Sequence, residues 1–303
     1  MALTQTECQS SVVIEPTPTS QTAAASRIGD WREVAPGVFV TVAEPAAVNL
    51  GLVVGSGGAL VIDTGSSPQQ GRQLRAAVAT VTERPLVGAV VTHWHYDHAF
   101  GMAAFDDLGT VAHESVRARL RPSASLDETT GQLGFRSSEL VNAHREIAVA
   151  AALDLGDRRV EIAHLGQGHT EGDLIVVVPD ADVVFTGDLL ESAGAPWFGD
   201  DSFPHEWGAT LDGVIGLMTS KSRAVPGHGD PVDREFVFGQ RSRIAAVSGE
   251  IRRLVDQGVA GSEALQQGSW PFPEANVAAG VARGYAQLAD HGLKGVRPTL
   301  PLA

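Results

Sequence analysis

Cysteine is almost absent from this chain of 303 residues. Cys8 is the only one, which excludes an intrachain disulfide and any zinc or iron–sulfur site built from several thiolates. A bound metal would therefore need histidine and carboxylate ligands. Long apolar runs are lacking as well, because stretches such as 174–178 fall far short of the roughly 18 residues that a membrane span needs. We expect no membrane partner.

Basic residues are also scarce. The chain has 22 Lys and Arg against 36 Asp and Glu, and its formal net charge of −14 repels phosphate backbones. We therefore expect no nucleic-acid partner. The residues before Arg27 include no basic residue and no sustained apolar stretch. The basic part and the apolar part of a signal peptide are therefore both missing, and we expect a cytoplasmic location. The oligomeric state stays open, with a homodimer as one alternative.

Composition and apolar periodicity divide the chain into three segments. Residues 1–29 are rich in Ser, Thr, Gln, Ala and Pro without periodicity, which predicts a disordered N-terminal tail. Short β-branched runs alternate with helical patterns over residues 30–235, which is typical of a mixed α/β catalytic domain. Residues 236–303 are predicted to be a C-terminal helical extension packed on the same domain, with amphipathic patterns over 234–257 and about 274–288.

The densest chemical signal is THWHYDH at residues 92–98, directly after a predicted buried strand. His93 and His95 lie two apart in an extended segment, so both point to the same side and can bind one ion. Asp97 and His98, where the chain turns into a helix, can bind a second ion. Four groups cannot complete two metal sites, so further ligands must come from elsewhere in the chain.

Three more candidates each lie in a glycine-bearing turn next to an apolar strand. They are His169 in GHT, Asp188 in TGD and His228 in PGHG. Small neighbours allow the backbone to approach closely at such turns. Apolar runs also end shortly before Asp63 and His93, and strand ends are where a rigid sheet presents ligands to a common cleft.

Together with Asp63 in IDTG, these motifs resemble the metallo-β-lactamase superfamily over about residues 31–235. The resemblance implies an α+β four-layer αββα sandwich, with a metal cleft along one edge and C-terminal helices in addition. It also implies two Zn²⁺ ions, with iron or manganese as alternatives because all three suit histidine and carboxylate ligands. The implied first site is His93, His95 and His169, and the implied second site is Asp97, His98 and His228, with Asp188 bridging both and Asp63 supporting them from behind.

The activity that the resemblance implies is dinuclear metal-dependent hydrolysis. Two cations lower the pKa of a bridging water toward about 7, and the resulting hydroxide would attack an ester, thioester, lactone or amide of a small-molecule substrate. Asp188 and Asp97 are the expected catalytic carboxylates. The leaving group would be protonated by Asp97 or by a metal-bound water, between which the sequence does not decide.

Two features of the sequence indicate the branch of the superfamily to which the chain is most similar. Asp188 is retained and a signal peptide is missing, which resembles the glyoxalase II and lactonase-like branches more than true β-lactamases. Three alternatives stay open. One is a mononuclear iron oxidoreductase similar to the sulfur dioxygenases, the second is a β-lactam hydrolase, and the third is a non-catalytic protein that keeps the fold and binds a metal.

Aromatic residues close to the motifs are candidates for substrate contact. An aromatic-rich segment at 196–207 follows Asp188 and either forms an apolar wall over the metals or packs onto the sheet. The candidate substrate contacts are Trp94, Tyr96, Trp197, Phe198 and His205. The polar segment 120–145 is either a mobile flap beside the cleft or a solvated connection.

Overall fold

Short β-branched runs form one continuous hydrogen-bonded sheet in the computed structural model, which describes residues 26–290. Along the sheet the strands follow the order β8-β7-β6-β5-β4-β13-β12-β11-β10-β9, and β3 pairs with β4 and carries β1 and β2. The N-terminal half contains β1 (Arg27–Ile28), β2 (Arg32–Ala35), β3 (Val38–Glu44), β4 (Val48–Val54), β5 (Ala59–Ile62), β6 (Leu86–Val90), β7 (Gly109–His113) and β8 (Arg145–Ile147). The C-terminal half contains β9 (Ala150–Asp154), β10 (Arg159–His164), β11 (Leu174–Val178), β12 (Val183–Glu191) and β13 (Arg223–His228).

The two halves of the sheet are joined where β13 pairs with β4, and they pack face to face. One hydrophobic core contains side chains of both halves, among them Val53 and Ile62 from the first and Val176 and Phe185 from the second. At Gly51 the halves are so close that an added Cβ would lie 2.4 Å from the Phe185 ring. The sheet therefore forms the two inner layers of a sandwich.

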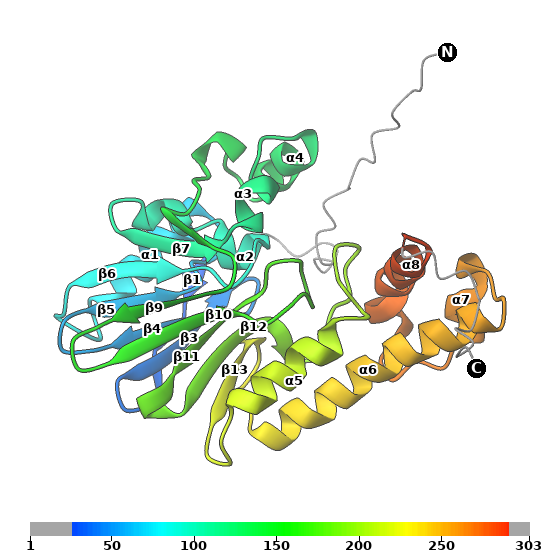
Figure 1. The fold of residues 1–303 in the computed structure, drawn as a ribbon. Helices are drawn as coiled ribbons and strands as arrows, with labels where there is room; N and C mark the ends of the chain where they lie inside the picture. Colours follow the sequence, from blue (N-terminus) through cyan, green and yellow to red (C-terminus); the bar gives the residue numbers. More distant parts are fainter. Residues whose placement is uncertain (1–25, 291–303) are drawn as a thin grey trace.

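Helices cover both outer faces of this sandwich (Figure 1). On the N-terminal half lie α1 (Pro68–Val78) and the 3-10 helix η1 (Met102–Phe105), and on the C-terminal half lie α5 (Trp207–Leu217), α6 (Arg234–Asp256) and α8 (Glu274–Asp290), with α7 (Gly261–Gln267) against α8. Shorter elements are α2 (Tyr96–Ala99), α3 (Ser115–Arg119), α4 (Ala124–Gln132), η2 (Ser137–Glu139) and η3 (Pro179–Ala181). The predicted αββα sandwich with C-terminal helices is confirmed.

Helix α6 shows how the sequence pattern produces the outer layer. The Asp233 side chain accepts a hydrogen bond from the backbone N–H of Phe236 and caps the helix start. The apolar positions at spacings of three, four and seven residues are all buried: Val237, Ile244, Val247, Ile251 and Leu254. They share one core with strand residues such as Ile175 and Val184, so the extension packs on the sandwich. The predicted boundary between residues 235 and 236 falls inside the first turn of this helix.

The predicted N-terminal tail, residues 1–29, lies mostly outside the described residues. Its last part is described, and there the prediction is wrong. Arg27 and Ile28 form β1, which pairs antiparallel with Glu44 and Ala43 of β3. Composition did not reveal this strand because its pairing rests on backbone hydrogen bonds to a sheet edge, which almost any sequence can supply.

The segment 120–145 contains α4 and η2 and is anchored to the protein by apolar contacts. Leu126 of α4 is buried and belongs to a cluster that also contains Trp94, Phe100 and Val116. The part of this segment that contains α4 therefore packs behind the THWHYDH motif. Within residues 26–290, none of the helices is long and apolar enough to cross a membrane.

Candidate metal centre

One edge of the sandwich collects the carboxyl ends of β5, β6, β12 and β13. These strands run in the same direction, because β5 is parallel to β6, β12 is parallel to β13, and β5 and β13 are each antiparallel to β4. Asp63 follows β5, the THWHYDH motif follows β6, Asp188 lies in the last part of β12 and His228 ends β13. His169 comes from the turn between β10 and β11. Topology thus brings together ligands that are far apart in the sequence.

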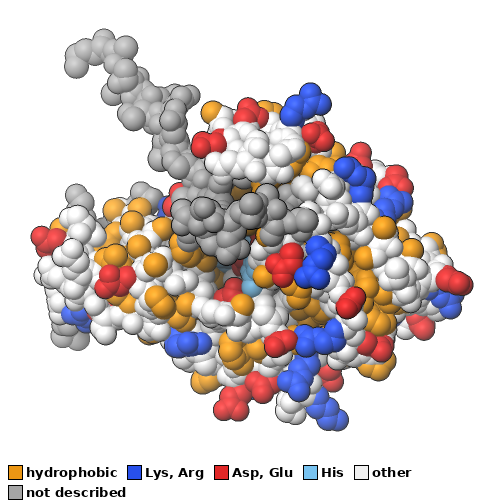
Figure 2. Space-filling view, turned by 180° about the vertical axis from the view of Figure 1, so that it is seen from behind, with side chains coloured by type: hydrophobic (Ala, Val, Ile, Leu, Met, Phe, Trp, Pro, Cys, Tyr) orange, Lys and Arg blue, Asp and Glu red, His pale blue; other side chains and the backbone are white. Residues whose placement is uncertain are grey.

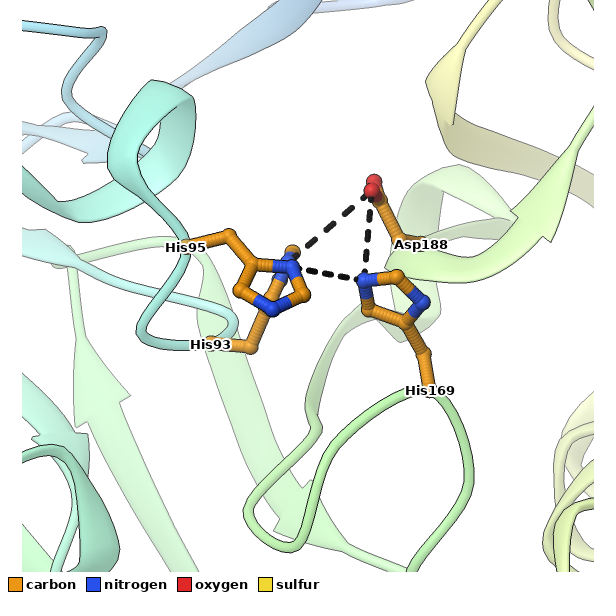
Figure 3. A group of neighbouring side chains, drawn as sticks. All are labelled: His93, His95, His169 and Asp188. Carbon is orange, nitrogen blue, oxygen red and sulfur yellow. Dashed lines mark hydrogen bonds and ion pairs between the residues drawn. The ribbon is translucent and has the colours of Figure 1, made fainter. Parts of the chain in front are cut away.

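His93, His95, His169 and Asp188 form the first cluster, whose ligand atoms all lie within 4.8 Å of one another (Figure 3). His95 Nδ1 lies 3.1 Å from His93 Nε2 and 2.8 Å from His169 Nε2. Asp188 Oδ2 lies 3.5 Å from His169 Nε2 and 3.9 Å from His93 Nε2. Ligand atoms around one tetrahedral zinc ion would be roughly 3.3 Å apart, given metal–ligand bonds of about 2.0 Å.

Asp97, His98 and His228 form the second cluster next to the first. Asp97 Oδ2 lies 3.3 Å from His228 Nε2 and 3.7 Å from His98 Nε2. Asp188 also faces this cluster, since its Oδ1 lies 3.0 Å from His98 Nε2. Asp188 therefore stands between the clusters, where the bridging ligand is predicted.

A register irregularity in β12 and a glycine in β13 make room for Asp188. The pairing of β12 with β13 shifts on both sides of Gly187, which has a positive φ of 52°. Such bulges redirect a side chain next to a functional site. Across the ladder, a Cβ at Gly227 would lie 1.7 Å from Asp188 Oδ1. The glycines of the TGD and PGHG motifs are thus explained by the space that this carboxylate needs.

Each histidine of the two clusters has its outer ring nitrogen next to an acceptor, so that the inner nitrogen is the one that faces its cluster. His169 Nδ1 lies 3.2 Å from the carbonyl oxygen of Trp197, and His228 Nδ1 lies 3.2 Å from that of Ala47. A carbonyl oxygen can only accept, so these nitrogens carry the proton. The other outer contacts are His93 Nδ1 with Thr92 Oγ1, His98 Nδ1 with Asp63 and His95 Nε2 with Asp201.

Asp63 lies behind the second cluster, as predicted for a supporting residue. Its carboxylate accepts hydrogen bonds from the backbone N–H and the hydroxyl of Thr92, at 2.7 and 2.9 Å, and lies 2.8 Å from His98 Nδ1. It thereby fixes both the start of the ligand motif and the orientation of the His98 ring.

The buried polar atoms of the two clusters test whether the site fits metal ions. Among residues 26–290, four of these side-chain atoms make ion-pair contacts but no hydrogen bond: Asp97 Oδ2, His98 Nε2, Asp188 Oδ1 and His228 Nε2. Carboxylate oxygens and the bare nitrogens of neutral histidines are all acceptors, so four of them facing one another require an explanation. Coordination of metal ions supplies it, and five histidines with two aspartates suit zinc, iron and manganese.

The two clusters differ in their electrostatics. Burial lowers the pKa of His93 and lowers that of His169 to about 4, and neighbouring imidazoles add to the effect. At His98 and His228 burial acts in the same direction, but Asp188 and Asp97 outweigh it and raise the pKa. His93 and His169 of the first cluster are therefore neutral imidazoles, the form that binds a cation, whereas His98 and His228 of the second cluster are ion-paired and a metal must displace their protons.

Little of the site reaches the surface. The side chains of His95 and His228 are 13% and 10% exposed. The space-filling view shows histidine side chains as a small patch in a recess with acidic and basic side chains nearby (Figure 2).

Several of the predicted substrate-contact side chains lie away from the metal clusters. Phe198 is fully buried against Trp207 and Phe272, and His205 contacts Ser248 of α6 and the carbonyl oxygen of Gly284 in α8, so both side chains face the C-terminal helices. The physical reason is that these helices offer the 196–207 aromatics an apolar surface to pack on. Trp94 is also buried, and its Nε1 donates to Asp201. Substrate contact at these three positions stays a prediction. Tyr96 and Trp197 are half-buried and stay predictions.

Asp201 is a site residue that sequence reasoning missed. Its Oδ2 lies 3.3 Å from His95 Nε2 and accepts a 2.8 Å hydrogen bond from Trp94 Nε1. Burial alone would raise the pKa of this carboxyl, but the His95 ring and the hydrogen bonds lower it. No pattern distinguishes Asp201 from its neighbour Asp200, which is exposed.

The sequence of the chain is similar to those of known proteins. The model of a family described as "Metallo-beta-lactamase superfamily" matches residues 43–228. The chain is 26% identical over 192 residues to "Metallo-beta-lactamase type 2" of Bacillus cereus, covering 62% of this chain and 70% of that protein. It is 28% identical over 225 residues to "Acyl-coenzyme A thioesterase MBLAC2" of Homo sapiens, covering 66% and 80%.

Solved structures show the same fold. The structure named "Metallo-beta-lactamase from Pontibacter korlensis" has a TM-score of 0.59 at 19% identity and covers 72% of this chain and 99% of that one. Relatives with different named activities match at similar identity, so a glyoxalase II or lactonase-like branch stays a prediction.

Proposed function

The chain belongs to the metallo-beta-lactamase superfamily and is a metal-dependent hydrolase of that fold, and from this premise we propose that it uses two metal ions, zinc foremost, to hydrolyse an acyl bond in a small molecule. The bond is an ester, thioester, lactone or amide. The observation that carries the proposal is the pair of adjoining clusters with Asp188 between them.

When bound, two metal ions would supply a water of lowered pKa and a Lewis acid for the substrate carbonyl. The side chains of this protein set the conditions for that chemistry. Asp188 faces both clusters and determines their separation, and Asp63 holds His98 in place. Asp97 has a lowered pKa, because His98 and His228 outweigh the effect of its burial, and it is therefore ionised at neutral pH. Because its Oδ2 faces His98 and His228 in the second cluster, its other oxygen, Oδ1, would accept the proton of the attacking water and return it to the leaving group.

The names of the relatives suggest two substrate classes. The protein of Bacillus cereus is named for β-lactams, and the human protein is named for acyl-coenzyme A thioesters. Both classes contain an electrophilic carbonyl, which suits the proposed attack by water. Since Asp188 is retained, we expect esters and thioesters to be hydrolysed faster than β-lactams.

The experiment is metal analysis combined with a substrate panel. Untagged protein is analysed by mass spectrometry for metal, and esters, thioesters, lactones and a β-lactam are assayed before and after chelation. We expect about two zinc ions per chain and a loss of at least about 100-fold in rate on chelation, reversed by added zinc. Full turnover by metal-free protein would overturn the proposal. One iron per chain with oxygen uptake on a persulfide substrate would replace it with the dioxygenase.

A further inference from the structure

Residues 195–206, which we call the 195–206 loop, form most of the connection between β12 and α5 and contact two histidines of the first cluster from behind. His169 Nδ1 lies 3.2 Å from the carbonyl oxygen of Trp197, and His95 Nε2 lies 3.3 Å from Asp201 Oδ2. The opposite nitrogens of the two rings, His169 Nε2 and His95 Nδ1, lie 2.8 Å apart and face the cluster (Figure 3). One loop thus orients two of the four candidate ligands.

Asp201 is the charged residue of this loop that contacts a candidate ligand, His95. Its side chain is 10% exposed, and the same oxygen that faces His95 also accepts the hydrogen bond from Trp94 Nε1. Trp94 in turn lies edge-on to His95, with ring centroids 4.6 Å apart. A carboxylate in this place keeps the proton on His95 Nε2 and leaves Nδ1 as the metal-binding atom.

The loop itself is held by α8 of the C-terminal extension, which lies beside it in Figure 1. The backbone N–H of Phe198 donates to the carbonyl oxygen of Asn276 at 2.9 Å, and Asn276 Nδ2 donates to the carbonyl oxygen of Ala195 at 3.2 Å. At the far end of the loop, Gln287 Nε2 donates to Glu206 at 2.8 Å. At Gly280 the two segments touch so closely that an added Cβ would lie 2.4 Å from Phe198 Cβ.

We infer that Asp201 is a positioning residue for the first metal site and that α8 sets its position through the 195–206 loop. The inference rests on the proposed function, because it requires a metal ion at the first cluster. The outer nitrogens of the second cluster are bound elsewhere, His98 by Asp63 and His228 by the carbonyl oxygen of Ala47. Disturbing the loop therefore weakens the first site and largely spares the second.

The direct test replaces Asp201 with asparagine, which keeps the shape of the side chain and removes its charge. Metal-free full-length protein is titrated with Co²⁺, and the two sites are separated by their absorption spectra and by competition with a chromophoric chelator. We expect Asp201→Asn to bind about 10- to 100-fold more weakly at one site and unchanged at the other. The matched control is Asp212→Asn on α5, which removes an exposed ion pair with Arg241 and should bind both ions as the wild type does.

The remote test addresses α8 without touching a ligand or Asp201. Gly280→Ala pushes Phe198 and should weaken the same site in the same direction. Gly249→Ala on α6 is its control, because an added Cβ there meets nothing within 4 Å. Should Gly280→Ala not fold, as judged by circular dichroism, Asn276→Ala removes the hydrogen bond to Ala195 instead.

The outcomes separate this inference from the proposed function. Wild-type protein that binds no Co²⁺ would overturn both. Two ions in the wild type with unchanged affinities in Asp201→Asn, or with equal loss at both sites, would overturn the role of Asp201 alone. Wild-type affinities in both folded α8 variants would overturn the role of the helix.

Discussion

Asp63 adopts a backbone conformation that few side chains tolerate. Its φ is 60°, in the left-handed region that favours glycine and, among other residues, asparagine and aspartate. The strain is compensated because the carboxylate then reaches both Thr92 and His98. This residue shows that the ligand motif depends on a partner that lies about 30 positions earlier in the chain.

Asp63→Asn is expected to weaken the second metal site. Asparagine accepts the same φ, so the backbone can stay in place, but the negative charge beside His98 is lost. We expect metal affinity at that site to fall about 10- to 100-fold and the free energy of unfolding to fall by about 1–3 kcal/mol. Co²⁺ titration and urea unfolding measure the two effects. Unchanged affinity would show that Asp63 does not orient His98.

Asp173 should make stability depend on pH. Its buried carboxylate accepts hydrogen bonds from the backbone N–H and hydroxyl of Thr170, which lower the pKa, but burial outweighs them and raises it to about 7. A raised pKa means that the folded state holds the proton more tightly than the unfolded state. The stability that Asp173 contributes is therefore fully present below about pH 4 and is lost as the pH rises through about 7.

The measurement is the difference in the free energy of unfolding between Asp173→Asn and the wild type. The metal ligands titrate in both proteins, so their contribution cancels in this difference. Urea unfolding at pH 5 and pH 8 should show the wild type losing stability relative to the variant as the pH rises, by up to about 1.4 kcal/mol per unit of pKa shift. A constant difference between the two proteins would contradict the raised pKa.

At the scale of elements, the close approach of β4 to β12 determines how the two halves of the sheet pack. Gly51→Ala would place a methyl group against the Phe185 ring, and overpacking of this kind costs about 1–3 kcal/mol. We expect a lower urea midpoint with an unchanged slope. Gly109→Ala in β7 is the matched control, since the nearest atom to its added Cβ is Val87 O at 3.6 Å. Equal midpoints for the two variants would argue against a tight interface.

For the whole molecule, the metal centre joins the two halves of the sheet. The THWHYDH ligands belong to the N-terminal half, whereas His169, Asp188 and His228 belong to the C-terminal half. Metal ions that bind the folded state alone stabilise it by about 2.7 kcal/mol per site when free metal is 100 times the Kd. We expect chelation to lower the thermal midpoint and added zinc to restore it. An unchanged midpoint would show that the clusters do not bind metal with useful affinity.

Sequence patterns alone predicted a mixed α/β domain and the candidate ligands, and the resemblance of the motifs to a known superfamily implied the αββα sandwich. Alternating residues at a strand end share a direction, and glycine-bearing turns beside apolar strands mark where a backbone approaches a site, so THWHYDH, GHT, TGD and PGHG could be interpreted locally. The buried face of α6 could be predicted for the same reason, since helical periodicity is a local property.

The contacts between distant segments became visible only in the folded protein. Asp201, unlike the exposed Asp200, faces His95 and Trp94, β1 pairs with the edge of the sheet at β3, and Phe198 and His205 turn toward the C-terminal helices. In each case the outcome depends on which surface lies opposite, and that surface comes from a distant part of the chain. Local sequence patterns carry no information about such a partner, because burial and outer hydrogen bonds arise when the layers pack.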